Sequence, residues 1–183
     1  MIAPQSPEQY FGEYQEVFET AEQKLLIDLG FKALPPRNHP LEAKIAQHET
    51  SQLGCYAIEY EGFINVFGDN EELVAGLILH RRWNAVAIYS FYIEPEYRGI
   101  GLGKRILQLA EDLALQMGGK ALVLETSTLH TYEFYLHNGF TVLSEMQGYI
   151  DGQLYFHMYK NLHDNNMPQE NVEVTEAESN SNA

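Results

Sequence analysis

The stretch from Ala85 to Ala114 constrains the fold more than any other part of the chain. It begins with Ala85–Ile93, a run rich in Val, Ile, Tyr and Phe that predicts a β-strand. Pro95 ends the strand, and apolar residues recur at helical spacing from Ile106 to Ala114. Three glycines lie between them: Gly99, Gly101 and Gly103. The residues therefore predict a strand, a glycine loop and a helix, in that order.

A glycine loop in front of a helix favours anion binding. Its backbone N–H groups are left unpaired beside the positive end of the helix dipole. Three cationic residues lie in or next to this loop: Arg98, Lys104 and Arg105. The chain as a whole has a formal net charge of −15, so a local group of cations needs an explanation. A ligand that carries phosphate supplies one.

Two common nucleotide-binding motifs do not fit the loop. The P-loop requires Gly-Lys-Ser/Thr, but Lys104 is followed by Arg105. The dinucleotide fingerprint requires a third glycine where this chain has Lys104 or Ile106, although Glu125 stands at the distance of a ribose-binding acid. The pattern that the loop does match is Arg-x-x-Gly-x-Gly, at Arg98, Gly101 and Gly103.

Together with the preceding run Ile93–Gly99, this pattern resembles the pyrophosphate-binding motif of the GNAT superfamily of acyl-CoA-dependent N-acetyltransferases. A second segment, Phe134–Phe140, resembles the Phe-Tyr-x-x-x-Gly-Phe helix end of the same family. The resemblance runs from about Glu72 to Leu162. It implies a mixed α+β fold, with a largely antiparallel central sheet, helices on both faces and a splayed pair of parallel strands. It also implies acetyl-CoA as cosubstrate, without a metal.

The resemblance gives the motif residues their expected roles. Tyr135 is the expected general acid, which protonates the thiolate of departing coenzyme A. The N–H of Ile93 is the expected oxyanion donor, and the pantetheine arm is expected to pair with the main chain near Tyr92 and Ile93. Arg98 adds charge for the pyrophosphate, which is expected at six consecutive backbone amides: Gly99, Ile100, Gly101, Leu102, Gly103 and Lys104.

The sequence does not assign a general base. Some family members carry Glu or His on the central strand, where this chain has Ala87 and Tyr89. Glu94 and Glu125 remain candidates, each against the simpler interpretation of a surface or loop carboxylate, and a chain of waters is a further alternative. Two histidines on predicted strands are interpreted as structural: His80 and His157.

Periodicity predicts the elements before the glycine loop. Tyr10–Leu29 fits an amphipathic helix that Gly30 ends, and in GNAT folds the first helical region lines the acceptor site. Its exposed side carries four carboxylates: Glu13, Glu16, Glu19 and Glu22. Leu41–His48 is predicted as a short helix. Two strands and their hairpin connection follow: Cys55–Tyr60, Glu72–His80 and Glu61–Glu71.

After the glycine-loop helix, Ala121–Thr126 predicts a short buried strand parallel to Ala85–Ile93. A helix is predicted from about Thr128 to His137, where Asn138-Gly139 caps it. The final strands are predicted at Phe140–Leu143 and Leu154–Tyr159.

Length and composition set the domain organisation. Residues 1–162 are predicted as a single acetyltransferase domain, and residues 163–183 as an acidic tail, disordered because it has too few apolar residues for a core. Cys55 is the only cysteine, which fits a reducing cytoplasm. The N-terminus does not resemble a secretion signal, and no apolar run approaches the ~20 residues of a membrane span. The net charge argues against nucleic acid as a partner.

Two functions are consistent with the sequence. The first is an N-acetyltransferase that moves an acetyl group from acetyl-CoA to a primary amine of a small molecule or a protein, by direct attack. The alternative is a non-catalytic acyl-CoA-binding or regulatory module on the same fold. The acidity of the chain favours a cationic acceptor. A homodimer is left open.

Overall fold

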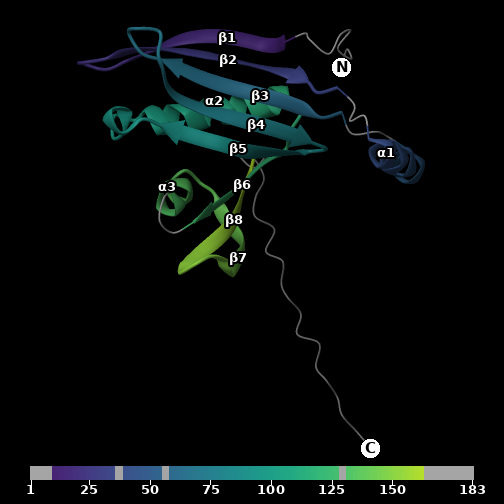
Figure 1. The fold of residues 1–183 in the computed structure, drawn as a ribbon. Helices are drawn as coiled ribbons and strands as arrows, with labels where there is room; N and C mark the ends of the chain where they lie inside the picture. Colours follow the sequence, from purple (N-terminus) through teal and green to yellow (C-terminus); the bar gives the residue numbers. More distant parts are fainter. Residues whose placement is uncertain (1–9, 36–38, 55–57, 128–130, 163–183) are drawn as a thin grey trace, which may run out of the picture.

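The computed structural model of the protein describes residues 10–35, 39–54, 58–127 and 131–162. An eight-stranded sheet forms its centre, in the order β1-β2-β3-β4-β5-β6-β8-β7 (Figure 1). The strands are β1 (Tyr10–Glu19), β2 (Lys24–Ala33), β3 (Tyr60–Phe67), β4 (Leu73–Arg82), β5 (Ala85–Ile93), β6 (Ala121–Ser127), β7 (Thr141–Ile150) and β8 (Gln153–Asn161). The helices are α1 (Pro40–Leu53), α2 (Leu102–Gln116) and α3 (Tyr132–His137), with a 3₁₀ turn η1 (Pro95–Tyr97).

The neighbours β5 and β6 are parallel, whereas the other neighbouring strands of the described sheet are antiparallel. Their pairing covers three residue pairs, from Ala85↔Ala121 to Ala87↔Val123. Beyond this point the two strands separate, and β6, β8 and β7 turn away from the first five strands (Figure 1). The mixed, largely antiparallel fold with one splayed parallel pair is therefore confirmed.

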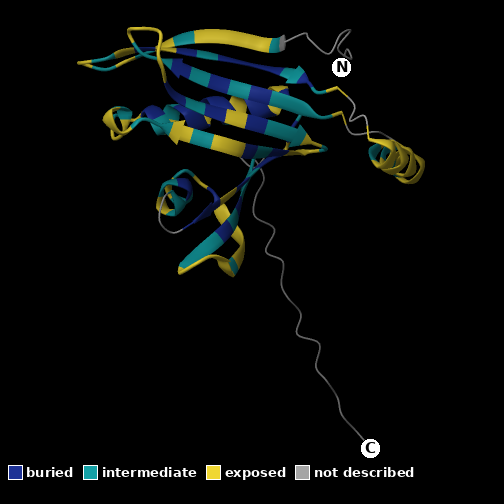
Figure 2. Ribbon diagram, viewed as in Figure 1, coloured by how far each residue is buried: buried dark blue, intermediate teal, exposed yellow. Residues whose placement is uncertain are grey.

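Helix α2 covers one face of the sheet. Its buried stripe includes Ile106, Ala110 and Leu113, which join one core with the inward-facing strand residues, among them Leu77 and Leu79 (Figure 2). On the other face of the first five strands, side chains are more open to solvent. Exposed large side chains on this face include Leu26, Ile78 and Tyr89. Among the described residues, no helix is long and apolar enough to cross a membrane.

The predicted helix over Tyr10–Leu29 is wrong, because the segment forms the hairpin β1–β2. Its turn is closed by Thr20, whose hydroxyl accepts the N–H of Gln23 at 3.0 Å. A register shift between Phe11 and Tyr14 interrupts the alternation of β1, so its apolar residues imitate helical spacing. In β2 the buried residues follow a period of two, and pairing with β3 overrides local propensity.

The predicted bounds of the strand Cys55–Tyr60 and of the connection Glu61–Glu71 are also wrong, whereas the predicted strand Glu72–His80 corresponds to β4. Strand β3 occupies Tyr60–Phe67, most of the predicted connection, and the turn to β4 lies within Gly68–Glu72. Cys55–Ala57 lies outside the described residues. Gly62 suggested a turn, but it lies inside β3 because α2 approaches closely there. A Cβ on Gly62 would lie 3.2 Å from Met117 Sδ.

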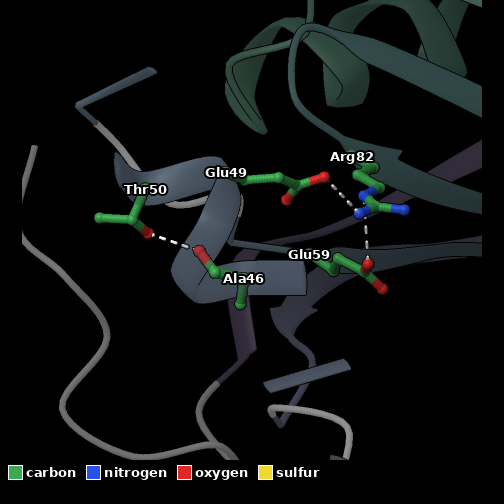
Figure 3. Close-up of polar contacts among 5 residues, drawn as sticks. All are labelled: Ala46, Glu49, Thr50, Glu59 and Arg82. Carbon is green, nitrogen blue, oxygen red and sulfur yellow. Dashed lines mark hydrogen bonds and ion pairs between the residues drawn. The ribbon is translucent and has the colours of Figure 1, made fainter. Parts of the chain in front are cut away.

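Helix α1 is longer than the predicted Leu41–His48, and none of its residues is buried. One arginine of β4 connects it to the sheet (Figure 3): Arg82 lies 3.2 Å from Glu49 of α1 and 3.6 Å from Glu59. At the other end of the chain, α3 begins at Tyr132, after residues 128–130, which the structure does not describe. The predicted lead-in 1–9 and tail 163–183 also fall outside the described residues.

Candidate active site

The glycine loop presents uncapped backbone N–H groups. Gly99 and Gly101 have φ values of +78° and +88°, in the left-handed region that favours glycine. A Cβ on either residue would meet no atom within 4 Å, so both glycines border open space. Gly101 is the N-cap of α2 without a side-chain cap, and the first helical hydrogen bond runs from the Arg105 N–H to the Gly101 carbonyl. The preceding amides of Leu102–Lys104 therefore remain for an external anion.

Gly103 has a different role from the two loop glycines. A Cβ there would lie 3.2 Å from both Ile93 Cδ1 and Phe134 Cζ. Its missing side chain lets the first turn of α2 approach the end of β5 and the helix α3. The glycine loop, the strand end and the segment that carries Tyr135 consequently converge.

The end of β5 presents its main chain to the opening between β5 and β6. The Glu94 N–H donates to the Val74 carbonyl of β4 at 2.9 Å. Because successive residues of a strand present their N–H groups to opposite edges, the Ile93 N–H and carbonyl face away from β4. The Arg98 Nε donates to this Ile93 carbonyl at 2.8 Å, and its guanidinium lies 5.8 Å from the centre of the Tyr92 ring. The structure thus brings these predicted site residues together.

The three cations expected around the loop are not equivalent. Arg98 and Lys104 are exposed. Arg105 instead binds Glu16 of β1 through both its Nε, at 2.7 Å from Glu16 Oε1, and its second guanidinium nitrogen. The hydrogen bond to Glu16 raises the Arg105 pKa. Glu16 therefore neutralises the charge of Arg105 within the protein. Arg98 and Lys104 are the two cations that remain for a phosphate ligand.

Tyr135 lies in the core beside this site, with 5% of its surface exposed. Its ring packs edge-on against Phe134 and Phe140, with centroids 5.4 Å apart in both cases. Burial raises the Tyr135 pKa to about 12, against a smaller opposing effect of a hydrogen bond with Thr131. The Thr131 hydroxyl also hydrogen-bonds the Thr126 hydroxyl of β6 at 2.8 Å. At neutral pH the phenol is therefore protonated, and it is connected to the β6 side of the opening.

A second polar cluster lies across β6, β8 and β7. Tyr155 donates its hydroxyl proton to Glu125 Oε2 at 2.8 Å, and His157 Nε2 lies 3.4 Å from Glu125 Oε1. The other ring nitrogen, His157 Nδ1, hydrogen-bonds Ser144 Oγ at 3.1 Å. Burial first, and the bond to Glu125 second, raise the Tyr155 pKa to about 12. Glu125, a base candidate in the sequence, and His157, interpreted there as structural, are neighbours in the structure.

The other base candidate, Glu94, and the second strand histidine, His80, lie outside this cluster. Glu94 accepts a hydrogen bond from the Tyr92 hydroxyl at 3.0 Å. His80 lies 3.4 Å from Glu61 of β3 and stacks on the Tyr89 ring, with centroids 4.8 Å apart. Among the described residues, no group of three or more His, Cys, Asp and Glu side chains is arranged to hold a metal ion.

Sequence reasoning missed Tyr155 and Ser144. A period of two within Gln153–Asn161 would have placed Tyr155 on the same face as His157. The buried Phe156 and Met158 alternate with these two residues. Ser144 had no local signal. A register shift between Val142 and Ser144 places it opposite His157.

The fold and the site define a mixed α+β protein that presents an uncapped helix N-terminus beside a splayed strand pair. A family comparison agrees with this class: residues 15–140 match the model of the acetyltransferase (GNAT) family. The chain belongs to the GNAT acetyltransferase family.

Three solved structures that match this chain are described as acetyltransferases. An acetyltransferase from Bacillus cereus is 15% identical with a TM-score of 0.56, over 68% of this chain and 94% of that one. A protein from Agrobacterium tumefaciens, provisionally described as an acetyltransferase, is 18% identical with a TM-score of 0.59, over 66% of this chain and 88% of that one. The PaiA N-acetyltransferase of Thermoplasma acidophilum, solved with coenzyme A, is 24% identical with a TM-score of 0.47, over 66% of this chain and 70% of that one. A comparison with curated proteins finds no match.

Proposed function

We propose that the protein moves the acetyl group of acetyl-CoA to a primary amine at the opening between β5 and β6. One observation supports this most strongly. The uncapped start of α2, the Ile93 N–H that faces away from β4 and the buried phenol of Tyr135 converge where the parallel strands separate. A cosubstrate with a phosphate end and a thioester end needs these features in this order.

In this proposal each end of acetyl-CoA has its own partners. The pyrophosphate binds the amides between Gly99 and Lys104, with Arg98 as the nearest cation. The pantetheine arm runs along the β5 edge near Tyr92 and Ile93, as an added strand would. The thioester carbonyl accepts a hydrogen bond from the Ile93 N–H, which stabilises the oxyanion as the amine attacks.

Tyr135 acts on the leaving sulfur. Its pKa of about 12 keeps it protonated, but full proton transfer to a thiolate, whose conjugate thiol has a pKa near 8.5, is uphill by about 5 kcal/mol. The phenol therefore donates a hydrogen bond to sulfur as negative charge develops in the transition state. The sulfur leaves as a thiolate that this hydrogen bond stabilises, and coenzyme A takes up its proton from solvent as it departs.

The acceptor is proposed to be cationic. The chain carries a net charge of −15, and Glu94 and Glu125 lie near the ends of β5 and β6. Glu16 no longer contributes, since Arg105 neutralises it. A negative electrostatic potential where the acceptor enters raises the local concentration of polyamines or lysine side chains. A single domain over 1–162 and a cytoplasmic location remain parts of this proposal.

The alternative is that the protein binds acyl-CoA without turnover. The deep burial of Tyr135 is the observation that supports this alternative. The two are separated by incubating the protein with acetyl-CoA and a panel of amines while free thiol is measured. Amine-dependent thiol release supports the transferase. Acetyl-CoA binding by calorimetry, without thiol release for any amine, supports the binding module instead.

A further inference from the structure

Four polar side chains form a cluster on the face of the sheet opposite α2: Glu125, Ser144, Tyr155 and His157. Their position follows from strand alternation. In β6, Leu124 and Thr126 are buried on either side of the exposed Glu125. In β8 the buried Phe156 and Met158 alternate with Tyr155 and His157.

Tyr135 lies toward the other face of β6. Thr126 points to that face and hydrogen-bonds Thr131, directly before α3, while Phe134 of α3 packs on Phe91 of β5. The opening between β5 and β6 is thus flanked by the phenol on one face and by Glu125 on the other. An amine and a thiolate occupy different directions around the tetrahedral carbon, so an acid and a base are useful on opposite faces.

Both nitrogens of the His157 ring face an oxygen. Nδ1 hydrogen-bonds Ser144 Oγ at 3.1 Å, and Nε2 lies 3.4 Å from Glu125 Oε1. The groups that face the ring are Glu125 from β6, Ser144 from β7 and Tyr155 from β8 itself. An imidazolium in this place has an acceptor for each N–H and a carboxylate to balance its charge.

We infer that His157 is the general base for the acceptor amine and that Glu125 binds the acceptor ammonium. This inference rests on the proposed acetyl transfer. The ammonium group binds Glu125 and passes one proton to His157 Nε2. The neutral nitrogen then attacks the thioester carbon, so the N–C bond forms and the C–S bond breaks. The sulfur leaves as thiolate beside Tyr135, and the amide nitrogen loses its second proton to solvent.

The proton transfer leaves the charge of the cluster unchanged. Before it, Glu125 balances the ammonium, and after it, the same carboxylate balances the imidazolium. Glu125 holds its orientation because Tyr155, protonated at neutral pH, donates to its second oxygen. Imidazole suits the task because it changes charge between about pH 5 and 8, whereas an ordinary carboxylate is a much weaker base.

The chain contains a matched control. His80 and Glu61 form a second histidine–carboxylate pair at the same 3.4 Å, with side-chain exposures of 39% and 38%. This pair lies on β4 and β3, and His80 is level with Ala87, where β5 and β6 are still paired and the opening has not begun. His80→Gln removes an imidazole of similar setting without touching the proposed base.

The experiment measures kcat/KM from pH 5 to 9 for the full chain. The acceptor is a weakly basic aromatic amine, which is uncharged over most of this range. With this acceptor His157 takes its proton from the attacking nitrogen as the N–C bond forms, so the ascending limb reports the protein. The wild type and His80→Gln are expected to show the same ascending limb of kcat/KM between about pH 5 and 8. His157→Gln is expected to lose this limb and to lower kcat by roughly a hundredfold to ten-thousandfold, with acetyl-CoA binding unchanged by calorimetry.

Glu125→Gln tests the ammonium site separately. It is expected to raise KM for an alkylamine by about tenfold to a hundredfold, because the carboxylate charge that strengthens the hydrogen bond to the ammonium is lost, and to leave KM for the aromatic amine unchanged. Ser144→Ala, which retains the imidazole, is expected to shift the limb, and it replaces His157→Gln if that variant does not bind acetyl-CoA.

The outcomes separate this inference from the proposed function. A wild-type limb retained in His157→Gln, or equal losses in His157→Gln and His80→Gln, overturns the base assignment while acetyl transfer stands. Where Ser144→Ala replaces His157→Gln, an ascending limb at the same pH as in the wild type overturns the base assignment. A wild type that transfers to no amine overturns the proposed function, and the base assignment with it.

Discussion

Replacing Tyr135 by phenylalanine separates the two roles that its position allows. The change removes one oxygen and retains a ring that packs between Phe134 and Phe140. If the phenol donates to the departing sulfur, kcat is expected to fall by roughly tenfold to a thousandfold at an unchanged acetyl-CoA affinity. Tyr132→Phe on the same helix is the control, since its ring stacks on Phe156.

Burial of the same phenol has a consequence for stability. The Tyr135 pKa rises from 10.0 to about 12 in the folded state, so folding favours the neutral form. This contribution is fully present below pH 10 and is lost as the pH rises toward 12. Its size, about 3 kcal/mol, follows from the difference between the two pKa values. A phenylalanine side chain does not ionise. The free energy of unfolding of Tyr135→Phe should therefore rise relative to that of the wild type by about this amount between pH 10 and 12.

Two assays check these values. Single-turnover thiol release gives kcat for the chemical step, and denaturant unfolding between pH 9 and 12 gives the difference in free energy of unfolding. All other ionising groups are common to both proteins and cancel in that difference. An unchanged rate with chemistry rate-limiting would show that Tyr135 has only a packing role. A stability difference that stays flat between pH 10 and 12 would refute the burial argument itself.

Four further results are expected. Gly101→Val and Arg98→Ala should each weaken acetyl-CoA binding in calorimetry, the first by placing a side chain in the open anion site, and undiminished binding by both would reject that site. Gly103→Val should instead lower the free energy of unfolding by about 1–3 kcal/mol in denaturant titrations, because its side chain meets Ile93 and Phe134, and an unchanged value would contradict the close approach. Deleting 164–183 should leave the melting temperature and acetyl-CoA binding intact, whereas a loss of many degrees would mean that the tail docks. A polyamine should be preferred over a neutral aromatic amine, with a kcat/KM that falls when salt is raised from low concentration to about 0.5 M, and insensitivity to salt would rule out electrostatic selection.

The glycine-loop region could be predicted from the sequence because its information is local. Strand β5 has the predicted bounds Ala85–Ile93, and α2 follows it with the expected buried stripe. Asn138-Gly139 ends α3 as predicted, with Gly139 at a φ of +85°. Glycine, proline and period-specific apolar residues act within a few positions of themselves, so these segments report their own structure.

Side-chain partnerships across the sheet could not be predicted in this way. The sequence predicts Arg105 as one of three cations for a phosphate ligand, but in the structure Glu16 of β1 forms an ion pair with it. The N-terminal segment has apolar residues that fit a helix in isolation, yet pairing with β3 makes a strand of Lys24–Ala33.

The order of residues along the chain was enough to establish the family, the glycine loop and the position of Tyr135 in its motif. The charges that remain for a ligand, and the residues that meet Glu125, emerged only from the folded sheet. The reason is register: His157 and Ser144 face each other because a shift in the β7–β8 pairing places them opposite, and Glu125 meets His157 across β6 and β8. Register is set by the packing of the whole sheet rather than by the residues that it brings together.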